Sequence, residues 1–85
     1  MNWQAIVRQL ADKHLRKFPR HDRDAIALAL DELSFDPYAG DIAKMEGEEE
    51  VWRRRVGSYR IKYEIHRKQK VIYVFEIERR TSSTY

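Results

Sequence analysis

Residues 51–66 read Val-Trp-Arg-Arg-Arg-Val-Gly-Ser-Tyr-Arg-Ile-Lys-Tyr-Glu-Ile-His, and this stretch decides the fold. Apolar and charged side chains alternate on both sides of Gly57-Ser58, and a period of two is the repeat of a β-strand buried on one face. Gly57-Ser58 supplies residues that favour a tight turn. The stretch therefore predicts a β-hairpin with strands over 51–56 and 59–66.

The segments that flank this hairpin predict further strands. A polar turn over residues 67–70 leads to 71–77, which is apolar on both faces at its start, as a central strand is. Near the N-terminus, residues 3–7 (Trp-Gln-Ala-Ile-Val) fit either a strand or the start of a helix that runs to Phe18. The β-branched pair Ile6-Val7 and the need to cover a sheet edge favour the strand.

Between these strands the apolar spacing is helical. Apolar residues recur at i, i+4 and i+7 within 11–18 and again within 26–33, and Pro19 separates the two sets. Asp36-Pro37 ends the second helix, the residues that follow to Asp41 read as a loop, and the acidic segment 46–50 is interpreted as a solvated loop. We therefore expect one α+β domain over residues 1–85, with an antiparallel pair of helices packed on one face of an antiparallel sheet of three to four strands.

Charge is unevenly distributed along the 85-residue chain. Its formal net charge is only +3, yet residues 51–70 hold eight basic side chains and one acidic one, whereas residues 1–50 hold seven basic and eleven acidic. A basic hairpin beside an acidic helical half indicates an anionic partner for the sheet.

Several classes of protein and of active site have no support in the sequence. The chain has no cysteine, which excludes disulfides, thiolate metal sites and a cysteine nucleophile and is typical of a reducing cytoplasm. It contains neither an apolar run of about 20 residues nor a signal-peptide pattern, so no membrane partner is expected. Neither a metal-ligand cluster, a Ser/His/Asp arrangement nor a phosphate-binding glycine loop is evident, and we expect no metal and no cofactor.

Four parts of the chain resemble the RelE/ParE superfamily of toxin–antitoxin toxins. They are residues 11–19, the loop 36–47, the hairpin 52–65 and the ending 77–85, of which the hairpin, with its basic strand, glycine turn and Tyr-Arg-apolar-x-Tyr pattern, is the most specific. The resemblance implies a toxin with a cognate antitoxin as partner. Within the superfamily, RelE-type members cut mRNA in the ribosomal A site, and ParE-type members poison DNA gyrase.

The resemblance also implies site residues. The arginine after the hairpin turn is Arg60, the basic pair on the preceding strand falls on Arg53 and Arg55, and the C-terminal arginine and tyrosine fall on Arg79 and Tyr85. Where well-known RelE-type enzymes have lysines, this chain has Arg53 and Arg55.

These residues suit cleavage of RNA without a metal, because RNA carries its own nucleophile in the 2′-OH. Arginine matches phosphate oxygens with a fork of donors, so Arg60, Arg53 and Arg55 are predicted to clamp the scissile phosphate. Arginine is a poor proton acceptor, which leaves Tyr85 as the predicted general base and Arg79 as support for the leaving group. Lys62 and Arg80 join Arg53 and Arg55 as predicted RNA contacts.

The sequence thus favours a cytoplasmic, ribosome-dependent mRNA endonuclease, with the ribosome and mRNA as further partners. A ParE-like inhibitor of gyrase and an inactive RNA-binding relative are the alternatives.

Two further expectations concern buried side chains. Arg54 shares the inward side of its strand, so it should snorkel or pair with an acidic group. Aromatic residues on the strands are predicted to pack in the core rather than to stack on bases: Trp52, Tyr59, Tyr63, Tyr73 and Phe75.

Overall fold

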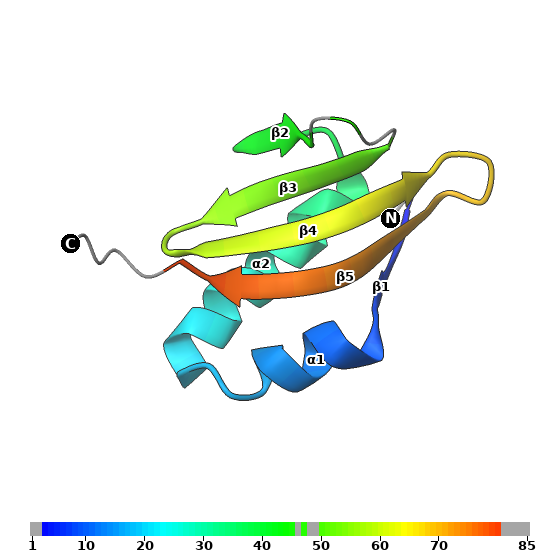
Figure 1. The fold of residues 1–85 in the computed structure, drawn as a ribbon. Helices are drawn as coiled ribbons and strands as arrows, with labels where there is room; N and C mark the ends of the chain where they lie inside the picture. Colours follow the sequence, from blue (N-terminus) through cyan, green and yellow to red (C-terminus); the bar gives the residue numbers. More distant parts are fainter. Residues whose placement is uncertain (1–2, 46, 48–49, 81–85) are drawn as a thin grey trace.

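The computed structural model describes residues 3–45, 47 and 50–80 and contains two helices and one sheet (Figure 1). The elements in chain order are β1 (Gln4–Val7), α1 (Gln9–Leu15), α2 (Arg20–Phe35), β2 (Ile42–Lys44), β3 (Val51–Val56), β4 (Tyr59–His66) and β5 (Val71–Arg79). The strands form one five-stranded sheet in the order β1-β5-β4-β3-β2. The predicted hairpin, the third strand and the N-terminal strand are confirmed, and so is the α+β class.

The sheet differs from the prediction in strand number and in direction. Residues 42–44 form β2, which pairs antiparallel with β3 at the edge of the sheet, although no strand was predicted there. A strand of three residues is too short to display a period of two. At the opposite edge β1 runs parallel to β5, with Gln4 beside Val71 and Val7 beside Val74, so the sheet is mixed rather than antiparallel. Alternation of side chains is the same in both directions, so it could not reveal this orientation.

Both helices cover one face of the sheet and form the core with it. Alternate residues of β4 from Tyr59 to Ile65 are buried and pack with Ala11 of α1 and with Ile26 and Leu33 of α2. Pro19 lies in the short turn between the helices and takes the N-cap position of α2, and Asp36 takes its C-cap position, as the sequence indicated. None of the helices in the described ranges is long and apolar enough to cross a membrane.

The other face of the sheet carries a cluster of charged side chains from β3 and β4, and we call it the open face. The register places Arg55 opposite Arg60 and Arg53 opposite Lys62, so all four alternate away from the helices. Tyr73 was predicted to lie in the core, and this prediction is wrong. A register shift after Lys62 sets Tyr73 opposite Glu64 on the open face, where it is half-buried. The bulge changes the alternation of β5, which the sequence pattern does not reveal.

A candidate phosphate-binding pocket

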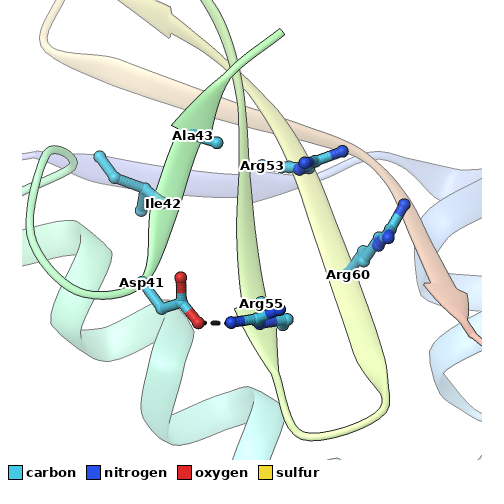
Figure 2. Close-up of a pocket in the computed structure, with 6 residues that line it drawn as sticks. All are labelled: Asp41, Ile42, Ala43, Arg53, Arg55 and Arg60. Carbon is cyan, nitrogen blue, oxygen red and sulfur yellow. Dashed lines mark hydrogen bonds and ion pairs between the residues drawn. The ribbon is translucent and has the colours of Figure 1, made fainter.

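Three of the predicted site residues, Arg53, Arg55 and Arg60, meet in one pocket on the open face, which we call the arginine pocket (Figure 2). The pocket has a volume of about 120 Å³, which leaves room for a small anion. Arg53 and Arg55 come from β3, Arg60 comes from β4, and the side wall is made by β2 and the residue before it. The complete lining is Asp41, Ile42, Ala43, Arg53, Arg55 and Arg60.

Strand alternation and register bring these arginines together. Arg53 and Arg55 are two residues apart on β3 and therefore point to the same face. Arg60 stands directly opposite Arg55, and like charges in that relation repel each other. Ala43 stands opposite Arg53 on the β2 side, where its small side chain keeps the pocket open. The arrangement concentrates positive charge in this pocket, and a bound anion would reduce the repulsion between the arginines.

One carboxylate also belongs to the pocket, and sequence reasoning missed it. The Oδ2 atom of Asp41 accepts a hydrogen bond of 2.9 Å from Nε of Arg55. Within the described ranges, Arg53 and Arg60 form no ion pair and are available to a ligand. Only the pairing of β2 with β3 brings Asp41 beside the arginines, and since β2 was not predicted the sequence held no signal for this contact.

Lys62 is already engaged by acidic side chains. Its ammonium lies 3.0 Å from a carboxylate oxygen of Glu76 and 3.2 Å from one of Glu78, and 19% of the side chain is exposed. The hydrogen bond to Glu76 is the main cause that raises the pKa of Lys62 above its ordinary value, so the group stays charged. The predicted contact of Lys62 with RNA therefore competes with two carboxylates of β5.

The structure places the two C-terminal arginines on opposite sides of the sheet. Arg79 stands opposite Tyr59, on the helix side, with its guanidinium carbon 5.8 Å from the centre of the Tyr59 ring. There it lines a separate cavity of about 300 Å³ with His21 and Asp22. Arg80 continues the pairing through a 2.6 Å hydrogen bond from its backbone N to the carbonyl of Ser58, so alternation assigns it to the open face.

Arg79 was predicted to support the leaving group, a role that requires it to lie in the arginine pocket. The structure places it in the separate cavity instead. Tyr85, the predicted general base, lies outside the described residues.

Tyr59 follows the Gly57-Ser58 turn and contacts α2 and the turn between the two helices. Its hydroxyl donates a 2.7 Å hydrogen bond to Oδ2 of Asp22, and its ring packs 4.6 Å from that of Phe18. Burial, assisted by this hydrogen bond, raises the pKa of the Tyr59 phenol above its ordinary value. The phenol is therefore held neutral and acts in packing.

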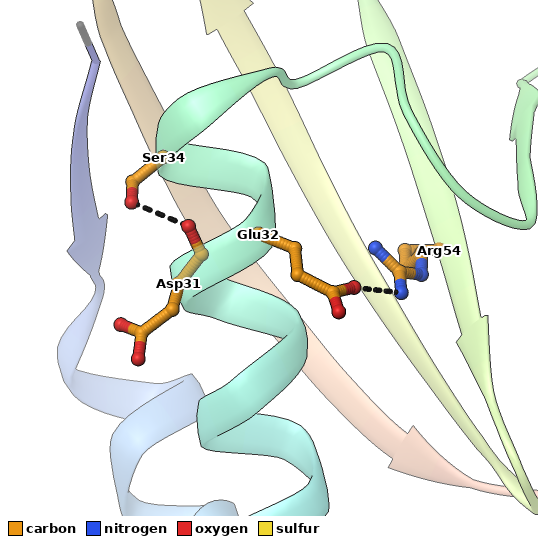
Figure 3. Close-up of polar contacts among 4 residues, drawn as sticks. All are labelled: Asp31, Glu32, Ser34 and Arg54. Carbon is orange, nitrogen blue, oxygen red and sulfur yellow. Dashed lines mark hydrogen bonds and ion pairs between the residues drawn. The ribbon is translucent and has the colours of Figure 1, made fainter. Parts of the chain in front are cut away.

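Arg54 fulfils the expectation that it pairs with an acidic group (Figure 3). Its Nη2 lies 2.6 Å from Oε1 of Glu32 on α2, and only 13% of the Arg54 side chain is exposed. The guanidinium packs under Gly40, where an added Cβ would come within 2.6 Å of the guanidinium carbon. Gly40 also has a φ of +87°, which favours glycine. Arg54 and Gly40 together fix the loop that presents Asp41 to the pocket.

No group of three or more His, Asp or Glu side chains in the described part of the chain is arranged to hold a metal ion. The groups that the arginine pocket offers for chemistry are three guanidinium groups and one carboxylate.

A family model describes the chain over nearly its full length. Residues 3–83 match the model of the ParE toxin of type II toxin–antitoxin systems, parDE. The chain belongs to this toxin family. A search of curated proteins found no match.

Several solved structures with the same fold as this ParE-family toxin are of RelE toxins. The RelE–RelB complex of Pyrococcus horikoshii OT3 matches with a TM-score of 0.84 and 25% identity, over 98% of this chain and 100% of that one. The isolated E. coli RelE toxin matches with a TM-score of 0.84 and 19% identity, over 95% and 87% of the two chains. The RelB–RelE complex of Methanococcus jannaschii matches with a TM-score of 0.72 and 26% identity, over 87% and 88%.

Proposed function

We propose that this toxin is a ribosome-dependent, metal-independent mRNA endonuclease that blocks translation in the cytoplasm. The observation that carries the proposal is the pocket of Arg53, Arg55 and Arg60 on the open face. Guanidinium groups match the oxygens of a phosphodiester, and they stabilise the additional negative charge that develops as the 2′-oxygen attacks phosphorus. The substrate supplies its own nucleophile, so neither a metal nor a cofactor is required.

The small size of this pocket supports the proposed dependence on the ribosome. Its volume of about 120 Å³ is on the scale of a phosphate group. The ribosome holds mRNA in an extended, ordered form, which supplies the positioning that the toxin lacks.

We also propose that a cognate antitoxin binds this toxin, since two of the similar RelE structures are complexes with RelB.

The test is cleavage of mRNA on programmed ribosomes, with 5′ ends mapped by primer extension. The wild-type toxin should produce breaks in the A-site codon. Arg60→Ala should slow cleavage by about 10²- to 10³-fold, the usual cost of removing one group that stabilises a transition-state charge. Arg23→Ala removes an equal charge from an exposed position on α2 and serves as the matched control.

Inhibition of DNA gyrase is the second candidate, because the matching family model is that of the ParE toxin. A supercoiling assay with purified gyrase separates the two functions. Inhibited supercoiling with intact mRNA would refute the endonuclease proposal, and A-site breaks with normal supercoiling would support it.

A further inference from the structure

The three arginines of the pocket do not supply one requirement of the proposed reaction, a group that takes the proton of the 2′-OH. Arginine stays protonated at neutral pH, because its guanidinium is a very weak acid. Arg53, Arg55 and Arg60 therefore stabilise charge but do not act as proton acceptors. A general base near this pocket must be a different type of side chain.

Asp41 is the one carboxylate among the described residues that line the pocket. It immediately precedes β2, and 59% of its side chain is exposed, so an entering ligand can reach it. Only one of its two oxygens, Oδ2, is drawn in contact with Arg55 (Figure 2). A carboxylate is one of the side-chain groups that serve as general bases in enzymes.

The position of Asp41 is fixed by its backbone as well as by its side chain. Its carbonyl accepts a 2.9 Å hydrogen bond from the backbone N of Arg55, and its carboxylate accepts one of the same length from Nε of that residue. The preceding residue, Gly40, rests on the guanidinium of Arg54, which is paired with Glu32. A carboxylate held from two sides beside a phosphate clamp has the geometric constraint that a general base needs.

We propose that Asp41 is the general base of the RNA cleavage reaction, an inference that rests on the proposed endonuclease function. A carboxylate oxygen of Asp41 takes the proton of the 2′-OH as O2′ bonds to the adjacent phosphorus and the P–O5′ bond breaks. The products are a 2′,3′-cyclic phosphate and a 5′-oxygen that takes a proton from water. Asp41 then returns its proton to solvent. The ion pair with Arg55 offsets the repulsion between the carboxylate and the bound phosphate.

A role limited to neutralising Arg55 makes the opposite prediction for the cleavage rate. In that case the carboxylate competes with the phosphate for the guanidinium, and its removal should strengthen binding and leave cleavage equal or faster. A general base should instead affect the rate of the chemical step and leave binding unweakened. The two roles are separated by measuring the cleavage rate and the affinity in the same variant.

The experiment compares Asp41→Asn with the wild-type toxin in single-turnover cleavage on programmed ribosomes at saturating toxin. The amide oxygen still accepts a hydrogen bond from Arg55, so folding should be preserved, and a thermal unfolding curve checks this. Asp24→Asn changes an exposed carboxylate of α2 outside the pocket and is the matched control. Asp41→Glu keeps the carboxylate but places it one methylene group farther from the backbone.

We expect Asp41→Asn to lower the cleavage rate by about 10²- to 10⁴-fold, the range for general base catalysis, with affinity for the programmed ribosome equal or higher. Asp41→Glu should recover part of the rate, and Asp24→Asn should match the wild type. A second substrate carries sulfur in place of the scissile 5′-oxygen, a leaving group that needs no protonation. The rate of Asp41→Asn should stay low with this substrate, because attack by the 2′-OH still requires a base.

Three outcomes overturn the inference: Asp41→Asn cleaves within about threefold of the wild-type rate, it cleaves faster, or the sulfur substrate restores it, which would make Asp41 the acid. A wild-type toxin that leaves mRNA intact refutes the endonuclease function itself, and with it the reaction that needs a base.

Discussion

In the ion pair between Arg54 and Glu32, the two side chains differ in burial. We therefore expect substitution of Glu32 to destabilise the protein more than substitution of Arg54. The Arg54 side chain is 13% exposed, whereas that of Glu32 is 51% exposed. Two nitrogens of the guanidinium, Nε and Nη1, are buried with no hydrogen-bond partner in the described structure. Loss of Glu32 therefore leaves a buried cation without its counter-charge, whereas loss of Arg54 returns a carboxylate to water.

The difference in burial sets the magnitudes. Removing one partner of a fully buried ion pair costs about 3–5 kcal/mol. Water reaches Glu32 and screens the pair in part, so we expect Glu32→Gln to lower the free energy of unfolding by about 2 kcal/mol. For a domain of this size that corresponds to a fall in Tm of about 8–16 °C. Arg54→Met replaces the charge with an apolar side chain under Gly40 and should change the free energy of unfolding by less than about 1 kcal/mol.

Thermal and urea unfolding of both single variants and of the double variant measure these values. The double variant should resemble Arg54→Met, because Glu32 has no buried charge to neutralise once Arg54 is absent. Asp24→Asn controls for the loss of one acidic charge from α2. The reasoning is refuted if Arg54→Met is more destabilising than Glu32→Gln, because the pair itself would then be the source of stability.

Three further predictions concern the loop, the phenol and the C-terminal arginines. Gly40→Ala should destabilise the protein by about 1–3 kcal/mol through a positive φ and a clash with Arg54, and urea unfolding should show that Arg54→Met recovers part of this loss. The raised pKa of Tyr59 means that its share of the folding free energy is fully present below pH about 10 and is lost as pH rises above that value, so melting temperatures from pH 8 to 11 should fall less steeply in Tyr59→Phe than in wild type. On programmed ribosomes Arg80→Ala should slow cleavage by about 10-fold or more, whereas Arg79→Ala should cleave within about threefold of wild type; the reverse order would place Arg79 in the arginine pocket.

The sequence was sufficient to predict the elements whose pattern is long and local. Sixteen residues with a period of two identified the hairpin, and Pro19 and Asp36 marked the helix ends. The direction of β1 depends on pairing between distant segments, and β2 is too short for its side chains to show a period of two, so a local pattern encodes neither. Tyr73 was misassigned for a related reason, because the bulge in β5 is a property of its pairing with β4.

The site was predictable to the extent that it lies within one hairpin. Alternation places Arg53, Arg55 and Arg60 on one face once the turn at Gly57-Ser58 is known. The contact of Asp41 with Arg55 requires β2, and the engagement of Lys62 by acidic side chains requires the register of β5. Charge counted along the chain is therefore a poor guide to the charge that a ligand meets, because partners from other strands neutralise part of it.

The parallel pairing of β1 with β5 has a consequence for the order in which the protein can fold during synthesis. Gln4 to Val7 are made before the other described strands, yet their partners are Val71 to Val74, which belong to the last of them. Until then β1 has no strand to join, and β4 exposes the edge that β5 will cover. A chain that stops before residue 71 cannot complete this sheet. The arginine hairpin is thus made before the sheet that supports it is closed, and the native toxin forms only once its last strand has been released for pairing.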